Sequence, residues 1–301
     1  MKKFLSHCAL GVSLMAMISF SHCSSKDDVP EPTPDQIEIY VSDAANFENP
    51  PWKILKYRED GSSPEIFIST NLGWPQDILF LEDQQVVLVS NFSTGNIVKF
   101  DIETGVFVGV FASGIGGPTR MKIGKDNLLY VLQWQGNGKI LRYNLNGTLV
   151  DQIGSIGVKE SIGLDWDEAG NIYVSSFNGG ANGFIRKFDP SGTDLGIFIK
   201  TGLQGPTNIW FDPNGNLLVN DWSTGAIKKI DANGSLMGNF ATGLSQPEGV
   251  AILDNGNILI GNGGNGSVKE YTSSGAFVKD RITPRSGGLI RPNAVVVRKV
   301  N

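Results

Sequence analysis

The chain repeats a segment of about 43 residues, and this repeat constrains the fold more than any other feature. A proline opens an apolar run at intervals of 43, 43, 45, 41 and 45 residues. This proline column consists of Pro75, Pro118, Ser161, Pro206, Pro247 and Pro292, with serine in place of proline once. Each unit holds four short apolar runs separated by turn residues, which is typical of the four-stranded blades of a β-propeller. The sequence therefore predicts an all-β propeller.

The unit that begins at Pro206 shows the expected strands most clearly. We expect them at Asn208–Phe211, Asn216–Asn220, Ala226–Ile230 and Leu236–Ala241. The turn before the fourth strand closes with a glycine in every unit: Gly61, Gly105, Gly147, Gly192, Gly234 and Gly275. Because glycine adopts positive φ without steric cost, these turns predict hairpins of one shared geometry.

The two ends of the repeat predict how the ring closes. Ile37–Asp43, Lys53–Tyr57 and Glu65–Ile68 supply three strands of a unit that lacks its first strand. Residues 293–300 form a first strand with nothing after it. Joining both ends gives a sixth blade, so we expect six four-stranded antiparallel blades over residues 37–301, closed by the C-terminal strand. Closure removes the exposed sheet edges of an open stack.

The N-terminal segment resembles a bacterial lipoprotein signal. Lys2 and Lys3 precede a twelve-residue, mostly apolar run at 9–20, too short to span a bilayer, and the run leads to Cys23. The resemblance implies a signal peptide over 1–22 and lipidation of Cys23, followed by a proline-rich tether up to residue 36. The sequence SSKDD after Cys23 is similar to the export tag of Bacteroidetes surface lipoproteins. We expect an outer-membrane lipoprotein on the periplasmic or cell-surface side; the alternative is an ordinary secretory leader.

Residue usage excludes several kinds of chemistry. Both histidines and both cysteines, His7, His22, Cys8 and Cys23, belong to the leader and lipidation site. The predicted domain therefore has no disulfide, no cysteine nucleophile, no Ser-His triad and no histidine-bound metal. The formal net charge is −5, or −7 without Lys2 and Lys3, so we expect no nucleic-acid partner. We expect a monomer that meets the membrane only through its lipid.

One column of the repeat is basic: Lys56, Lys99, Arg142, Lys187 and Lys229, with Glu270 at the sixth position. Such a stripe invites an anion-binding interpretation. We interpret it as a solvated or inter-blade position that recurs because the blade recurs.

The segment GPTNIWFDPNGNLLVNDWSTGAIKKID, residues 205–231, resembles the blade of NHL-type propellers and of the virginiamycin B lyase group. The Pro-x-Gly starts of some blades are also similar to those of the SMP-30/gluconolactonase propellers. The resemblance implies a six-bladed propeller but not a function, because the matching residues are mostly turn and core positions. The lyases rely on histidines, which are absent after the leader.

Loops of variable length follow the second strand of each blade and share one face with the proline column. Variable loops on a rigid scaffold commonly carry binding groups. Aromatic rings and polar groups at this face suit a carbohydrate, a peptide or another envelope protein. The expected ligand-binding residues are Trp74, Asp77, Phe92, Arg120, Trp134, Phe177, Asn208 and Trp222. The alternative is structural: rings that pack between blades, and polar groups that cap their own loops.

The gluconolactonase resemblance implies a metal site. Those propellers hold a divalent ion with Glu, Asp and Asn oxygens, some from P-N-G and P-D-G segments. Gln246-Pro247-Glu248-Gly249 and Arg291-Pro292-Asn293-Ala294 are similar to these segments, so Glu248, Asn293 and Asp221 are candidate ligands for Ca²⁺ or Mg²⁺. We favour a non-catalytic binding protein without a cofactor. The alternatives are a metal-dependent, lactonase-like hydrolase and a scaffold whose channel is filled.

Overall fold

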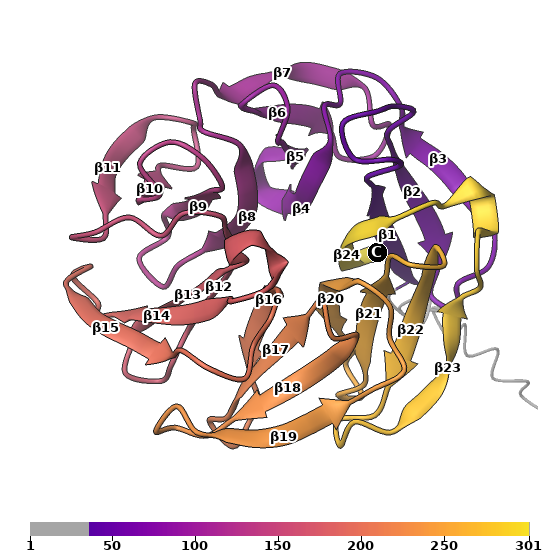
Figure 1. Cartoon of the computed structure of the whole chain (residues 1–301). Coiled ribbons are helices and arrows are strands. Elements are labelled where there is room, and N and C mark those ends of the chain that lie inside the picture. Colours follow the sequence, from indigo (N-terminus) through magenta and orange to yellow (C-terminus); the bar gives the residue numbers. More distant parts are fainter. Residues whose placement is uncertain (1–35, 301) are drawn as a thin grey trace, which may run out of the picture. The chain divides into compact units, whose positions relative to one another are not determined.

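The computed structural model describes residues 36–300, which form six four-stranded antiparallel sheets around a central axis (Figure 1). This confirms the predicted fold class and blade number. The predicted signal peptide, Cys23 and most of the tether lie outside the described residues. Within the described range no helix is long and apolar enough to cross a membrane.

Five blades are continuous in sequence, and their strands follow one another from the inside of the ring outward. Blade 2 contains β4 (Pro75–Leu81), β5 (Val86–Asn91), β6 (Asn96–Asp101) and β7 (Phe107–Ala112). Blade 3 contains β8 (Pro118–Ile123), β9 (Leu129–Gln133), β10 (Ile140–Tyr143) and β11 (Leu149–Ile153). Blade 4 contains β12 (Ser161–Trp166), β13 (Ile172–Ser176), β14 (Phe184–Phe188) and β15 (Asp194–Ile199).

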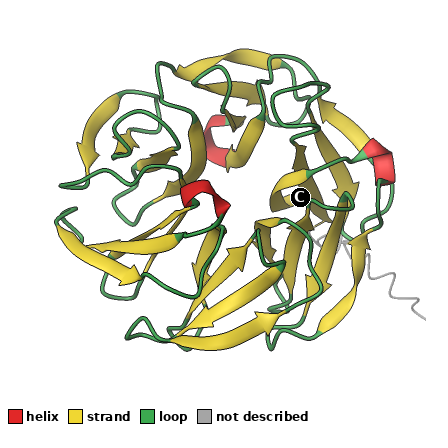
Figure 2. Ribbon diagram, viewed as in Figure 1, coloured by secondary structure: helices red, strands yellow, loops and turns green. Residues whose placement is uncertain are grey.

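Blades 5 and 6 continue the same pattern. Blade 5 contains β16 (Pro206–Phe211), β17 (Leu217–Asp221), β18 (Ala226–Ile230) and β19 (Leu236–Ala241). Blade 6 contains β20 (Pro247–Ile252), β21 (Ile258–Asn262), β22 (Ser267–Tyr271) and β23 (Phe277–Ile282). The described residues also form three short 3₁₀ turns (Figure 2): η1 (Glu82–Gln84), η2 (Asn178–Gly180) and η3 (Ser286–Gly288).

Blade 1 joins the two ends of the described chain. Its strand order is β24-β1-β2-β3, formed by β24 (Pro292–Val300), β1 (Gln36–Asp43), β2 (Lys53–Arg58) and β3 (Glu65–Ile68). The C-terminal strand β24 is the innermost strand of the blade and pairs antiparallel with β1, with Val295 opposite Val41. The predicted closure is therefore confirmed, and β24 begins one residue earlier than expected.

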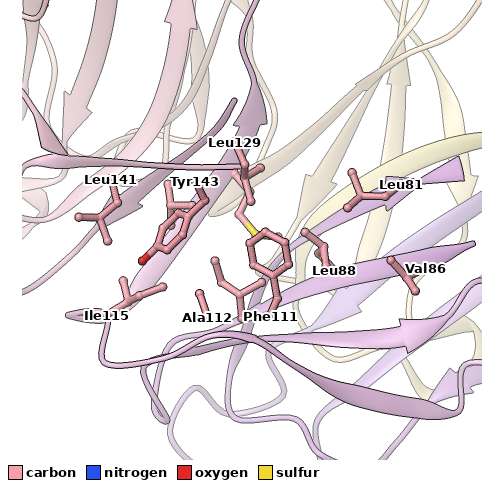
Figure 3. Packing of buried hydrophobic residues seen from close by; sticks show 12 residues of the cluster. Leu81, Val86, Leu88, Phe111, Ala112, Ile115, Leu129, Leu141 and Tyr143 are labelled. Carbon is pink, nitrogen blue, oxygen red and sulfur yellow. The ribbon is translucent and has the colours of Figure 1, made fainter. Parts of the chain in front are cut away.

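The hydrophobic core is divided into six clusters, one at each interface between neighbouring blades. Figure 3 shows the interface of blades 2 and 3, where Leu88 and Phe111 of blade 2 lie with Leu129 of blade 3. Successive residues of a strand serve opposite interfaces: Leu88 faces blade 3, whereas Val87 faces blade 1. Each blade is thus buried on both faces only because both of its neighbours are present.

Hydrogen bonds between neighbouring blades reinforce this contact. The hydroxyl of Ser90 donates to the carbonyl oxygen of Thr119 at 2.7 Å, and the hydroxyl of Thr119 donates to that of Ser161 at 2.8 Å. Thr207 continues the pattern toward Pro247 at 2.9 Å. Small hydroxyl side chains on first and second strands therefore link these neighbouring blades through backbone carbonyl acceptors.

The basic column has a structural role. Lys187 pairs with Asp167 at 3.5 Å, and Lys229 pairs with Asp212 at 3.0 Å. At the sixth position the column residue is acidic instead of basic: Glu270 pairs with Arg281 at 2.7 Å. These pairs within blades favour the structural interpretation over the anion-binding one.

Replacing Val295 by aspartate tests the closure, because Val295 is only 3% exposed in the cluster between blades 1 and 6. A charge buried there has no partner, so we expect the free energy of unfolding to fall by more than about 3 kcal/mol. The matched control is Val278→Asp on outermost strand β23, 44% exposed, which we expect to change it by less than about 0.5 kcal/mol. Urea denaturation followed by tryptophan fluorescence measures both values. Equal effects would show that β24 does not seal the ring.

Candidate functional site

The site lies where the inner strands begin. Pairing of each inner strand with its neighbour shifts register directly after the proline column, for example between Pro75 and Asp77 and between Pro247 and Val250. Such bulges interrupt the alternation of side chains and re-aim them. The first residues after each proline therefore turn toward the channel, and this places Gln76 and Glu248 in the wall of one cavity. Proline is tolerated there because it is the first residue of its strand.

A second column, of polar residues at the ends of the second strands, holds the entry loops, which are the connections that lead into each blade just before the proline column. Both carboxylate oxygens of Asp221 accept backbone N–H bonds at 3.0 Å, from Gln204 and Gly205. The side-chain oxygen of Asn91 accepts the N–H of Gly73 at 2.9 Å. These side chains fix the connection that enters their own blade. The structure thus supports the loop-capping interpretation for this column.

Aromatic side chains follow this column directly, and the backbone holds them in equivalent places. The N–H groups of Phe92, Trp134 and Trp222 donate to the carbonyl of the residue before the proline column, at 2.8 to 3.1 Å. Phe177 makes the same contact at 3.0 Å. Trp74, which accepts the bond from Phe92, has a φ of 51°, a conformation that tryptophan rarely adopts. The entry loop therefore dictates where each ring lies.

The rings form one continuous arc. Successive centroids lie 4.5 to 6.1 Å apart, and the ring planes are inclined by 40° to 77°. These are the distances and tilted geometries that aromatic pairs favour. The arc contains, in order, Phe47, Trp74, Phe92, Trp134, Phe177 and Trp222. It spans blades 1 to 5.

Phe47 is the ring that the sequence analysis did not identify. It lies in the long loop 44–52, whose carbonyl at Phe47 accepts the indole N–H of Trp52 at 2.7 Å. The guanidinium carbon of Arg291 lies 4.2 Å from the Phe47 ring centroid. This loop is the longest of the connections between second and third strands and has no counterpart in the other blades. The repeat therefore did not predict Phe47. An aromatic residue in an unusually long loop was the available signal.

The arc surrounds a cavity of about 550 Å³ at the mouth of the channel. Its wall consists mostly of the six rings, together with Ile162 and loop residues 46–49. The polar side chains on its inner strands are Gln76, Thr207, Glu248 and Asn293. A large, mainly apolar cavity with a few polar groups is the usual form of a ligand site. Five of the eight predicted ligand-binding residues meet here: Trp74, Phe92, Trp134, Phe177 and Trp222.

Asp77, Arg120 and Asn208 lie elsewhere, in a smaller cavity of about 240 Å³ farther along the inner strands. They follow the proline by two residues, whereas Gln76, Thr207 and Glu248 follow it by one. The structure therefore separates the predicted ligand-binding set into a mouth group and a channel group.

A buried ion cluster divides the two cavities. The guanidinium of Arg120 lies 3.4 Å from a carboxylate oxygen of Asp77 and 3.5 Å from Oε1 of Glu248. Asp77 also accepts the backbone N–H of Met121 at 2.8 Å. Arg120 donates to the carbonyl oxygens of Gln76 and Ile162. Arg120 Nη2 and Glu248 Oε1 nevertheless make no hydrogen bond.

Burial dominates the electrostatics of this cluster. Desolvation raises the pKa of Glu248 to about 7, against the opposing charges of Arg120 and Arg291, while Asp77 adds to the rise. Burial likewise raises the pKa of Asp77, although Arg120 and two backbone N–H groups oppose the shift. A carboxyl whose pKa is near neutrality beside a cavity is able to exchange a proton there.

The predicted metal ligands are only partly brought together. Glu248 and Asn293 both line the mouth cavity, but the carboxylate of Asp221 is occupied by the entry loop and is not in the wall. Within residues 36–300 no group of three or more His, Cys, Asp and Glu side chains is placed to hold a metal ion. Calcium commonly takes six to eight oxygen ligands. The side chains present do not fit that requirement, because two of the three candidates remain and one of them faces Arg120.

Solved structures share this fold over most of the chain. A chain in the crystal structure of a nidogen/laminin complex aligns with a TM-score of 0.70 and 16% identity, over 87% of this chain and 98% of that chain. A protein of unknown function from Bacteroides caccae aligns with a TM-score of 0.67 and 16% identity over the same shares. A putative gluconolactonase aligns with a TM-score of 0.60 and 17% identity, over 71% and 79%.

These neighbours bear out the expected likeness to gluconolactonase-like propellers at the level of fold. At such identities the likeness shows the fold alone, because one fold hosts many functions. No protein-family profile matches the sequence, and no curated protein is significantly similar to it. Function therefore has to be argued from the mouth itself.

The raised pKa of Glu248 predicts a pH dependence of the free energy of unfolding. The native state binds this proton more tightly than the unfolded chain does, so stability contributed by Glu248 falls as pH rises from about 4.5 to about 7. We expect Glu248→Gln to remove this contribution, on the order of 1 to 3 kcal/mol across the window. Urea denaturation of both proteins at pH 5 and pH 7.5 measures the difference. Parallel pH dependences for the two proteins would contradict the assignment.

Proposed function

We propose that this protein is a non-catalytic binding protein whose aromatic mouth holds a peptide segment of a partner. The observation that carries the proposal is the unbroken arc of six half-buried rings around one cavity of about 550 Å³. Half-buried rings still offer apolar surface, and ordering them at a fixed site lowers the entropy lost on binding. Tryptophan in particular is enriched at binding hot spots.

A peptide suits the mouth better than a carbohydrate does. The hydroxyl of Thr207 and the amide N–H of Asn293 already donate to backbone carbonyls. Few polar groups of the inner wall are thus left for a ligand. A sugar ring carries many hydroxyl groups, each of which costs free energy when it is buried without a partner. A peptide side chain requires fewer polar contacts. In the neighbouring nidogen/laminin structure the fold occurs in a protein complex, which is consistent with a protein partner.

Two of the candidate carboxyl groups are already engaged by other groups of the protein, which argues against a catalytic role for these two. Asp77 is bound to Arg120 and to a backbone N–H, and Asp221 is bound to its entry loop. Neither is free to act on a ligand at the mouth.

Placement at the cell envelope belongs to the same proposal. A lipid on Cys23 and a tether up to residue 36 would present the propeller near the outer membrane, on its periplasmic or cell-surface side. The leader and the proline-rich composition of residues 30–34 support this arrangement. A partner peptide would then come from another envelope protein.

The aromatic arc provides the direct test. A random dodecapeptide library is selected on the wild-type domain, and the clones are measured against Trp134→Ala and Trp222→Ala. We expect each variant to weaken binding at least about tenfold, because each removes a large ring from the wall. Phe277→Ala, at a ring 55% exposed on outermost strand β23, is the matched control and should leave affinity unchanged. An oligosaccharide panel is measured in parallel.

Selected peptides that bind both tryptophan variants as tightly as the wild type would refute the mouth as the site. Binding of the oligosaccharides alone, lost in the same variants, would assign the mouth to a carbohydrate instead.

A hydrolase remains the second candidate, because one observation favours it. Glu248 is buried beside the cavity with a pKa raised to about 7, a value suited to general acid or base catalysis. The metal-dependent form predicts that Ca²⁺ or Mg²⁺ stabilises the fold. We expect millimolar concentrations of either ion, or of EDTA, to leave the melting temperature unchanged. A rise with Ca²⁺ that Glu248→Gln abolishes would favour the hydrolase over the binding protein.

A further inference from the structure

The charged residues of the mouth cavity are all acidic. Glu48 lies on the loop that carries Phe47, and Glu248 lies on β20 of blade 6; among residues 36–300 no lysine or arginine is in the wall. Arg120 lines the other cavity, and Arg291 lies outside the wall, where its guanidinium donates to the side chain of Gln246. A ligand in the mouth therefore meets carboxyl groups before it meets a cation.

Glu248 is incompletely satisfied. The residue is only 7% exposed, and its Oε1, itself buried, accepts no hydrogen bond from the described part of the chain, although Arg120 lies 3.5 Å away. A buried carboxylate oxygen without a donor is costly, and native structures usually supply a partner for such an atom. The charged groups around it are Arg120 on β8, Asp77 on β4 and Arg291 before β24. Because Glu248 lines the mouth cavity, a donor that enters through the mouth meets this carboxyl group.

The aromatic rings also favour a positively charged ligand. The face of an aromatic ring attracts a cation, most strongly where water is excluded. The protein uses this contact at the edge of the arc, since the guanidinium of Arg291 lies 4.2 Å from the Phe47 centroid. The remaining five rings of the arc have no cation within contact distance among the described residues. They are available to a cation that the ligand brings.

We propose that the mouth selects a peptide side chain with a positive charge, lysine or arginine, which passes between the aromatic rings and donates to the carboxyl group of Glu248 in the cavity wall. This inference rests on the proposed peptide-binding function and specifies its ligand. The apolar stem of such a side chain packs against the rings while its charged end reaches the carboxyl group. Glu48 at the rim adds attraction at longer range.

The test uses four pentapeptides with blocked ends, in which a central lysine, arginine, norleucine or glutamate is flanked by glycines. Binding to the full domain at pH 8, above the pKa of about 7 to which burial raises Glu248, is followed through the indole N–H signals in ¹H–¹⁵N spectra. We expect lysine and arginine peptides to bind at least about tenfold more tightly than norleucine, which has a similar stem without the charge. We expect no binding of the glutamate peptide.

Two charge variants refine the test. Glu248→Gln keeps the shape of the side chain and should reduce the preference for lysine over norleucine to less than about threefold. Glu59→Gln, at an exposed position in a turn of blade 1, is the matched control and should keep the full preference. If Glu248→Gln does not fold, the peptide series on the wild-type protein decides the question by itself.

The failures of the two proposals are distinguishable. If norleucine or glutamate peptides bind as tightly as lysine, and Trp134→Ala still weakens them, the inference about charge is overturned while the peptide site stands. If neither the four peptides nor any library clone responds to the tryptophan variants, the peptide-binding function itself is wrong.

Discussion

The pairing of β24 with β1 is the constraint on which the rest of the structure depends. A single blade cannot bury its faces, and each of the six clusters needs side chains from two neighbouring blades. Without β24, blade 1 lacks its inner strand, and the clusters on both of its sides lose Val295 and Ala294. The noncovalent joint between the chain ends therefore holds the circle, and with it the channel and its mouth.

Two structural features that recur in the blades form the mouth, and both also stabilise the fold. Bulges after the proline column turn residues such as Glu248 into the channel, and polar side chains such as Asp221 hold the entry loops. Each aromatic residue after the second strand then donates its N–H to the held loop, so the rings come together in one arc. Binding groups on a rigid, repeated scaffold are ordered before a ligand arrives, which favours affinity.

The fold was accessible from sequence because the period, the turns and the two incomplete ends all indicate the same ring. Four of the rings were predicted for the same reason, since their place after the second strand recurs, and Trp74 was predicted from its place at the same end of a blade, before Pro75. Phe47 was not, because its loop has no counterpart. Asp77 and Arg120 were expected at the mouth, but the two sides of an inner strand differ by one residue, and the bulge decides which side faces the mouth. Asp221 was a candidate ligand because an aspartate after a strand has the same sequence appearance whether it binds a metal or caps a loop.

The central claim is that ring closure converts repeated loop residues into one aromatic, acidic site. A crystal structure of the domain with the lysine pentapeptide tests this claim most directly. The account predicts the lysine stem between rings of the arc and its nitrogen within hydrogen-bond distance of a carboxyl oxygen of Glu248. Peptide density on the outer strands, in the smaller cavity beyond Arg120, or with its nitrogen turned away from Glu248 would contradict it.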